Sequence, residues 1–137
     1  MDFSLKEEQR LIQQTAQRLA AEVLAPNAAE VDASRVFPRA NLAKMAEAGL
    51  LGMLLPPPVG GGGADTLSFV LVTEALAKAC ASTAFVFTTH VASAFGLLAF
   101  GGDAAKRQFL PDLAAGRRLA AFAVTEPGSG ANPLAIQ

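Results

Sequence analysis

The sequence predicts an all-α fold, an up-down helical bundle that is followed by the first strand of a β domain. Apolar residues recur at three- and four-residue intervals from Leu5 to Leu113. Residues that cap or end helices separate these stretches. Only residues 119–125 combine the length and the apolar continuity of a strand. We therefore expect a helical domain over residues 1–118 and the start of a middle β domain over residues 119–137.

Length, charge and cysteine content narrow the class of protein. At 137 residues the chain is long enough for one domain with a core. Its 11 basic and 12 acidic residues give a net charge of -1, so it lacks the basic footprint of a nucleic-acid-binding protein. The single cysteine, Cys80, permits no internal disulfide and is expected to be a small core residue. We expect a cytoplasmic setting.

Two amphipathic helices are expected first. The stretch from Ser4 to Glu7 has the Ser-x-x-Glu form of a capping box, and apolar residues follow at helical spacing until Pro26. Pro38 suits the first position of a second helix, and Gly49 is suited to end it. Pro26 is expected to end the first helix because proline lacks the N–H group that a helix interior needs.

A proline- and glycine-rich loop at residues 56–63 precedes the third expected helix. The loop is interpreted either as a connector between helices or as a place where a ligand or a neighbouring subunit approaches the backbone closely. The connector is favoured. Asp65 then suits the capping position of the third helix, and Glu74 and Lys78, four residues apart, are expected to pair on its exposed side.

The fourth expected helix, at residues 79–102, carries no charged side chain if His90 is neutral. Its apolar residues occupy all faces, so we expect it in the middle of the bundle, enclosed by the others. A membrane span is the alternative, but Thr88, Thr89 and His90 would each need a partner in lipid, and no span is predicted. His90 is interpreted as a hydrogen-bonded core residue rather than a base, and no set of metal ligands accompanies it.

A fifth helix and the strand complete the chain. Asp103 suits the capping position of the helix, Pro111 is expected to bend or end it, and Gly116 closes a final turn. Residues 119–125 then form the predicted strand, which has no partner strand in this sequence. Either a second chain or a further segment should supply its sheet.

The strongest functional signal is the segment of residues 121–133, Ala-Phe-Ala-Val-Thr-Glu-Pro-Gly-Ser-Gly-Ala-Asn-Pro. A strand that delivers the Thr125 hydroxyl into a turn with Gly128 and Gly130 exposes backbone N–H groups to an anionic or heteroaromatic ligand. Gly-x-Gly alone is weak evidence, because the third glycine of a dinucleotide fingerprint and the lysine of a P-loop are both lacking. Its position after the strand indicates donors aimed at a flat ring and then at a phosphate.

Four blocks of the sequence occur in the order and spacing of a known family. Residues 5–10 open the first helix, and residues 56–63 form the proline and glycine loop. Residues 101–116 cover the fifth helix, and residues 122–128 include the strand and the start of its turn. With these blocks, the chain resembles the N-terminal part of a flavin-dependent acyl-CoA dehydrogenase from Phe3 to about Asn132. The last block is the most specific.

The resemblance implies an activity for the complete enzyme. In that family a glutamate removes the α-proton of an acyl-CoA substrate, the β-hydrogen leaves as hydride to FAD, and a trans-2-enoyl-CoA forms. The family's catalytic glutamate and C-terminal bundle lie beyond Gln137, so we expect no catalytic residue here and no activity from this chain alone. The resemblance also implies an electron-transfer flavoprotein as partner and a homotetramer of the complete protein. The alternative is a non-catalytic helical interaction or structural module derived from the family.

The resemblance also assigns cofactor-binding residues. Phe122, Val124 and Thr125 would line the flavin, with the Thr125 hydroxyl near the pyrimidine edge of the ring. Gly130 would approach the FAD pyrophosphate.

The position after Gly130 departs from the family pattern. The family usually has serine or threonine there, followed by aspartate, whereas this chain has Ala131 and Asn132. In the family, the hydroxyl at this position would contact both the FAD phosphates and the substrate, and Ala131 lacks it. By its position, Ala131 is nevertheless assigned to both the cofactor site and the substrate site. Ser129, two residues upstream, is a candidate replacement.

On the helical side, four residues fall where the family's central helix borders the acyl chain: Phe85, Thr88, Thr89 and Ala92. Their helical spacing fits a buried core face equally well.

Overall fold

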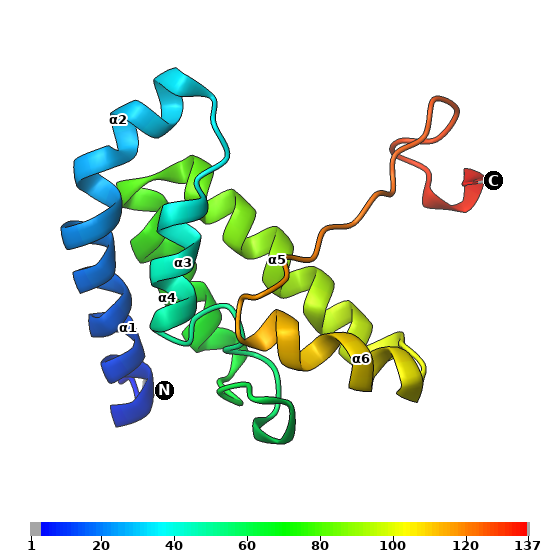
Figure 1. The fold of residues 1–137 in the computed structure, drawn as a ribbon, viewed down its shortest axis with the longest axis horizontal. Coiled ribbons are helices and arrows are strands. Elements are labelled where there is room, and N and C mark those ends of the chain that lie inside the picture. Colours follow the sequence, from blue (N-terminus) through cyan, green and yellow to red (C-terminus); the bar gives the residue numbers. More distant parts are fainter. Residues whose placement is uncertain (1–3, 137) are drawn as a thin grey trace.

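The computed structural model describes residues 4–136 as a helical body with an extended C-terminal tail (Figure 1). The outermost residues of the two expected domains, 1–3 and 137, lie outside the described residues, and the division at residue 118 stays a prediction. Within the described range, six α-helices confirm the all-α class: α1 (Glu7–Leu19), α2 (Ala25–Ser34), α3 (Arg39–Glu47), α4 (Thr66–Ala79), α5 (Ala81–Phe100) and α6 (Asp103–Ala114). Two short helical turns lie between them, η1 (Ala20–Leu24) and η2 (Pro57–Val59), and a third, η3 (Pro133–Ala135), lies in the tail.

The first helix does not end at Pro26, and that prediction was wrong. The π-helical turn η1 lies just before the proline, and in it the amide of Ala25 donates to the carbonyl of Ala20, five residues back. The extra residue in this turn shifts the hydrogen-bond register, so Pro26 falls in the first turn of α2, where no N–H donor is needed. The helical segment continues to a left-handed residue, Arg35, with φ of 55°.

The first helix is capped at Lys6 rather than at Ser4. The Lys6 amide donates to the side-chain oxygen of Gln9 over 3.0 Å. The predicted cap of α4 is confirmed, because the Asp65 carboxylate accepts from the Ser68 amide over 2.8 Å. Gln9 also donates to Asp65 over 2.7 Å, which joins the starts of α1 and α4. These hydrogen bonds, led by the one from the Ser68 backbone, lower the pKa of Asp65.

Two apolar cores hold the helices together. The larger core lies between α1, η1, α3, α4 and α5, and Phe87 of α5 is fully buried in it, with its ring centre 5.7 Å from that of Phe69. The smaller core joins α5 to α6 around Leu55, Leu110 and Leu113. Since α5 contributes to both cores, it is the element that connects the two halves of the helical body.

A polar network is buried inside the larger core. Asn41 of α3 exchanges hydrogen bonds of 2.7 and 3.2 Å with Asn27 of α2, and it donates to the Thr83 hydroxyl over 3.0 Å. The Cys80 sulfur lies 3.1 Å from the same hydroxyl. Cys80 is therefore a buried core residue, as predicted, and the network joins α2, α3 and the start of α5.

The helix α5 is not enclosed on all faces, which corrects the expectation from its composition. Phe85, Phe95 and Phe100 are 73%, 48% and 92% exposed. The other helices of this chain pack against only one side of α5, so apolar side chains remain on its outer face. By length and composition α5 could cross a membrane, a test that the core helix of a soluble protein also passes. The absence of a span stays a prediction.

The proline and glycine loop folds back on the chain itself. The amide of Gly63 donates to the carbonyl of Leu55 over 2.9 Å, and the amide of Ala64 donates to that of Met53 over 2.7 Å. A Cβ atom added at Gly61 would lie only 2.0 Å from the Leu55 carbonyl oxygen. The close approach that the glycines permit is therefore to this chain's own backbone, which supports the connector interpretation.

The helix α6 continues through Pro111 to Ala114, further than a helix-ending proline would allow. Gly116, with φ of +70°, then closes the turn as predicted. Beyond it, the chain leaves the helical body as the orange-to-red tail of Figure 1.

The predicted strand at residues 119–125 is not formed. The segment is extended, but within the described residues the tail's one ladder contact is a bridge between Glu126 and Ser129. A strand requires a neighbour that accepts and donates its backbone hydrogen bonds, and no described segment pairs with this one.

Candidate functional site

The tail ends in a compact turn that includes the glycine motif. Glu126 and Ser129 exchange two backbone hydrogen bonds of 2.8 and 3.0 Å. The Ser129 hydroxyl donates to the Asn132 carbonyl over 2.7 Å, and Ser129 is only 5% exposed. This hydroxyl therefore holds the turn together, which argues against Ser129 as the replacement for the hydroxyl missing at Ala131.

The predicted flavin residues all lie exposed on the tail. Phe122 and Val124 are exposed apolar side chains, and alternate residues of an extended chain lie on the same side. The turn brings Thr125 close to Gly130, because a Cβ at Gly130 would lie 3.9 Å from the Thr125 methyl carbon. Among the described residues, the amides of Thr125, Gly130 and Ala131 donate to no other backbone group. These amides remain available for a ligand.

The four predicted substrate residues share one face of α5. Their spacing of i, i+3, i+4 and i+7 puts them on the same side of a helix. Phe85 and Ala92 are exposed, while Thr88 and Thr89 are half-buried. The Thr88 hydroxyl donates to the Phe85 carbonyl over 2.9 Å, so it is occupied within the helix. Phe85 and Ala92 thus give this face exposed apolar surface that is open to a partner or a ligand.

One predicted substrate residue, Ala92, also lines an apolar groove of about 440 Å³ between α4 and α5. Phe85, Thr88 and Thr89 are not among its lining residues. Phe95 lies in the groove three residues after Ala92, and its regular spacing was the signal that could have identified it. The lining residues are Leu54, Ala64, Asp65, Thr66, Phe69, Val91, Ala92 and Phe95.

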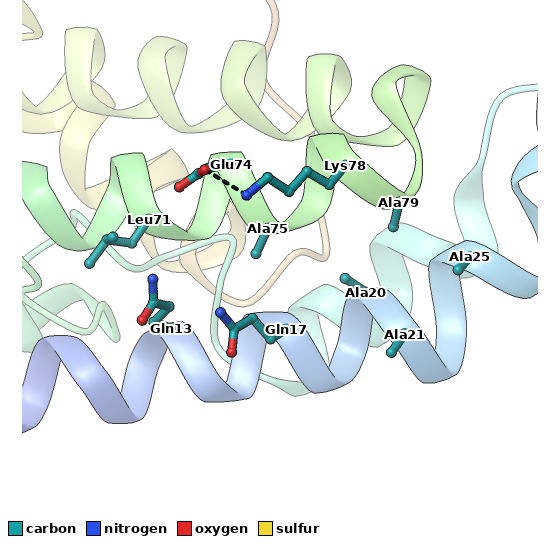
Figure 2. A pocket seen from close by; sticks show the side chains of 10 residues that line it. All are labelled: Gln13, Gln17, Ala20, Ala21, Ala25, Leu71, Glu74, Ala75, Lys78 and Ala79. Carbon is teal, nitrogen blue, oxygen red and sulfur yellow. Dashed lines mark hydrogen bonds and ion pairs between the residues drawn. The ribbon is translucent and has the colours of Figure 1, made fainter.

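A second groove, of about 340 Å³, lies between the α1–η1 segment and α4 (Figure 2). Figure 2 shows the side chains of Gln13 and Gln17 directed toward α4, with small alanine side chains beside them. The predicted ion pair of Glu74 and Lys78 is confirmed at 2.6 Å. Both partners are well exposed, so the pair is a solvated surface contact rather than a catalytic carboxylate.

His90 is buried at the base of the tail. Its Nδ1 atom accepts a hydrogen bond of 3.0 Å from the Ala120 amide. Burial lowers the pKa of His90, although hydrogen bonding to the backbone of Leu113 and Leu51 opposes the shift. The ring is therefore neutral at pH 7, as expected for a hydrogen-bonded core histidine. Between residues 4 and 136, no three His, Cys, Asp or Glu side chains gather to hold a metal ion.

Sequence comparisons place these features in a known context. Residues 6–117 match the family described as "Acyl-CoA dehydrogenase, N-terminal domain". The chain is 37% identical to acryloyl-CoA reductase (NADH) of Anaerotignum propionicum, covering 100% of this chain and 35% of the relative. It is 34% identical to the short-chain-specific acyl-CoA dehydrogenase of Clostridium acetobutylicum, covering 100% of this chain and 36% of the relative. The chain thus spans about a third of the length of these curated relatives.

Solved structures have the same fold. Butyryl-CoA dehydrogenase of Megasphaera elsdenii matches with a TM-score of 0.92 at 32% identity, over 100% of this chain and 37% of that chain. A second match is a chain in the structure described as "Electron transferring flavoprotein of Acidaminococcus fermentans: Towards a mechanism of flavin-based electron bifurcation". Its TM-score is 0.94 at 36% sequence identity, and the match covers 100% of this chain and 36% of that chain. Acyl-CoA dehydrogenase complexed with FAD from Bacillus anthracis matches with a TM-score of 0.89 at 32% sequence identity, over 97% of this chain and 23% of that chain. The resemblance is confirmed, and the chain belongs to the acyl-CoA dehydrogenase family, whose N-terminal domain it carries.

Proposed function

We propose that this chain is the N-terminal part of an FAD-dependent acyl-CoA dehydrogenase that converts an acyl-CoA thioester into the trans-2-enoyl-CoA. The observation that carries the proposal is the tail turn, in which Thr125 lies beside Gly130 and backbone amides remain available. Free backbone amides beside a glycine suit an anionic or heteroaromatic ligand, and a similar structure of the same family is described as complexed with FAD.

The tail offers chemical groups that suit FAD. Phe122 and Val124 provide exposed apolar surface for the isoalloxazine ring, and Thr125 provides a hydroxyl and an amide for the polar edge of that ring. Gly130 has no side chain to keep a pyrophosphate away from the backbone. When bound, FAD supplies the acceptor for the hydride that leaves the acyl β-carbon. The residues of this chain bind and orient that cofactor.

The outer face of α5 suits the acyl chain of the substrate. Phe85 and Ala92 expose apolar surface there, and the groove beside Ala92 and Phe95 is lined mainly by apolar side chains. An apolar wall holds a hydrocarbon chain and excludes water from the reacting carbons. The hydroxyls of Thr88 and Ser93 are directed to helix carbonyls, so they add little polarity to this wall.

The proposal extends to partners and location. An electron-transfer flavoprotein is the proposed electron acceptor, and a homotetramer is the proposed assembly of the complete protein, both by family resemblance. The description of one similar structure as an electron transferring flavoprotein supports the first of these. A cytoplasmic location is proposed because the chain's one cysteine is a buried free thiol, as is usual in reducing compartments.

The experiment that tests this proposal is an anaerobic titration of the full-length protein, expressed from its own gene and loaded with FAD, with saturated acyl-CoA substrates. We expect flavin absorption bands that bleach on addition of substrate, together with an enoyl-CoA product that is two hydrogens lighter. Reduction of enoyl-CoA by NADH is assayed alongside, because one relative is named as a reductase. A protein that binds no flavin after reconstitution with FAD would sink the enzyme proposal and favour the non-catalytic helical module.

A pair of variants connects the result to the tail. Thr125→Val keeps the shape of the side chain and removes its hydroxyl, and it should weaken FAD binding about tenfold. Thr15→Val makes the same change on α1, where the hydroxyl only donates to the Leu11 carbonyl. This control should leave FAD binding unchanged. Equal effects of the two variants would contradict the assignment of Thr125.

A further inference from the structure

A buried histidine anchors the tail to the helical body. The ring of His90 is 0% exposed, and its Nδ1 atom accepts from the Ala120 amide over 3.0 Å. The next residues, 121–125, are all exposed and form no hydrogen bond with the helices among the described residues. The bond to His90 is thus the last buried constraint on the chain before Thr125.

The geometry of this bond fixes the state of the ring. Because Nδ1 accepts a hydrogen bond from an amide, it carries no proton, so the imidazole is neutral with its own proton on Nε2. Nε2 is buried and makes no hydrogen bond of standard geometry, although the ring interacts with the backbone of Leu113 and Leu51, which raises its pKa against the effect of burial. An unsatisfied buried polar atom is costly, and a leucine would fill this space without that cost. Among the ring's polar contacts, the one that reaches the tail is the bond from the Ala120 amide, and a leucine could not accept it.

The other contacts at the root of the tail are weaker constraints. Asp112 accepts from Arg117 over 2.8 Å and lies 3.2 Å from Arg118, and the two arginines are well exposed. Exposed ion pairs of this kind contribute little to rigidity or stability. They also act two or three residues before Ala120. The Arg118 amide also donates to the Asp112 carbonyl over 3.2 Å, and Ala120 packs against the smaller core. The His90 bond is the hydrogen bond to the helices that lies nearest to Thr125, so it helps to set the direction in which the chain continues.

Small changes at this root produce large displacements at the motif. Thr125 lies five extended residue steps beyond Ala120, which corresponds to a reach of about 17 Å. A rotation of about 10° at the root would therefore move Thr125 by about 3 Å, whereas binding groups must be held to within roughly 0.5 Å. A buried anchor at Ala120 thus matters for what residues 122–131 can contact.

We propose that His90 is a positioning residue, whose neutral ring holds Ala120 and so directs the segment 121–131 toward its ligand. The effect on flavin binding rests on the proposed function, whereas the effect on the tail does not. His90 itself touches neither substrate nor cofactor in this proposal. It acts through the backbone that carries Thr125 and Gly130.

Three substitutions test the proposal. His90→Leu keeps apolar volume and removes the acceptor. His90→Asn retains a side-chain oxygen near the place of Nδ1. Val72→Ala is the control, because Val72 is a buried residue of α4 that belongs to the larger core, lines neither groove and does not bond to the tail. It should lower the melting temperature without releasing Ala120.

The first measurement is the hydrogen exchange of the Ala120 amide in the chain itself. We expect roughly tenfold faster exchange in His90→Leu, no change in Val72→Ala and partial recovery in His90→Asn. Unchanged exchange in His90→Leu overturns the proposal. If His90→Leu does not fold, the ¹⁵N spectrum of the wild-type imidazole decides, because a neutral ring protonated on Nε2 supports the anchor and protonation on Nδ1 overturns it.

The second measurement is the FAD dissociation constant of the full-length protein. His90→Leu should weaken binding about tenfold, and Val72→Ala should leave it unchanged. Faster Ala120 exchange with unchanged FAD affinity overturns the positioning role toward flavin. Wild-type protein that binds no FAD overturns the proposed function instead, while the exchange rate of Ala120 still decides whether His90 anchors the tail.

Discussion

The substitution Gly61→Ala tests the architecture of the loop that precedes α4. A Cβ atom at this position would lie 2.0 Å from the Leu55 carbonyl oxygen, 2.3 Å from its carbonyl carbon and 2.6 Å from its Cβ atom. Contacts under 3.0 Å are essentially never made by real Cβ atoms, so the backbone must move by about 1 Å. Because two of these three atoms belong to the main chain of Leu55, no change of side-chain rotamer relieves the clash.

The magnitude follows from the hydrogen bonds that such a shift disturbs. Gly62 donates to Gly52 over 3.1 Å, Gly63 to Leu55 over 2.9 Å and Ala64 to Met53 over 2.7 Å. Losing two of these bonds costs about 2 kcal/mol, and overpacking adds about 1 to 3 kcal/mol. We therefore expect a loss of about 3 to 5 kcal/mol in the free energy of unfolding, which corresponds to a fall of roughly 10 °C or more in melting temperature.

The assay is thermal and urea unfolding followed by circular dichroism at 222 nm. The control is Gly96→Ala in α5, where an added Cβ has nothing within 4 Å. Because glycine is a poor helix former, this control should raise stability by about 0.5 to 1 kcal/mol. A shift of about 2 °C or less is what a substitution on the surface would give. A Gly61→Ala variant that melts that close to the wild type would refute the reasoning about the loop.

Three further predictions concern the core, the histidine and the cofactor site. Asn41→Ala should lower the free energy of unfolding by about 2 to 4 kcal/mol in urea unfolding, more than Asn27→Ala does. The reason is exposure, because water can reach the half-exposed site of Asn27 and replace its hydrogen bonds, whereas the site of Asn41 is buried. Burial lowers the pKa of His90 below the value of 6.5 that the unfolded chain has, so the free energy of unfolding should be constant above pH 6.5 and fall as the pH drops below it. His90→Asn should flatten this fall when unfolding is measured between about pH 7.5 and 5. Ala131→Ser should strengthen FAD binding about tenfold or more by restoring a hydroxyl, whereas Ala123→Ser should not, as titration calorimetry would show.

Signals that act between neighbours in the sequence predicted the helices well. Asp65 caps the residues that directly follow it, and Glu74 pairs with Lys78 within one helical turn, so both could be foreseen without knowledge of the fold. Pro26 was different. Whether proline ends a helix depends on the register of the preceding turn, and the π-turn at Ala20–Leu24 has no clear sequence signature.

Features that depend on distant parts of the molecule were harder to predict. Residues 119–125 have the composition of a strand, but pairing requires a second segment, and none is described beside them. Apolar residues on all faces of α5 suggested that other helices enclose it completely, whereas its outer side is open in this chain. Both discrepancies lie on the surfaces assigned to the cofactor and the substrate. An apolar pattern shows that a residue is to be covered, but not what covers it.

The candidate site was predicted in part. The sequence identified the tail motif, and the structure brings Thr125 next to Gly130. The sequence did not predict that Ser129 would be held within the turn, because its partner is a backbone carbonyl whose position depends on the turn geometry. It identified His90 as a core residue, but not its bond to Ala120, which is 30 residues away.

The most direct test of the central claim is hydrogen exchange of the full-length protein, followed by mass spectrometry with and without FAD. The account predicts that FAD slows exchange in peptides that cover residues 122–131, and that the groove between α1 and α4 is unaffected. FAD that binds tightly without protecting residues 122–131 would contradict the claim that the tail of this domain is a flavin-binding segment.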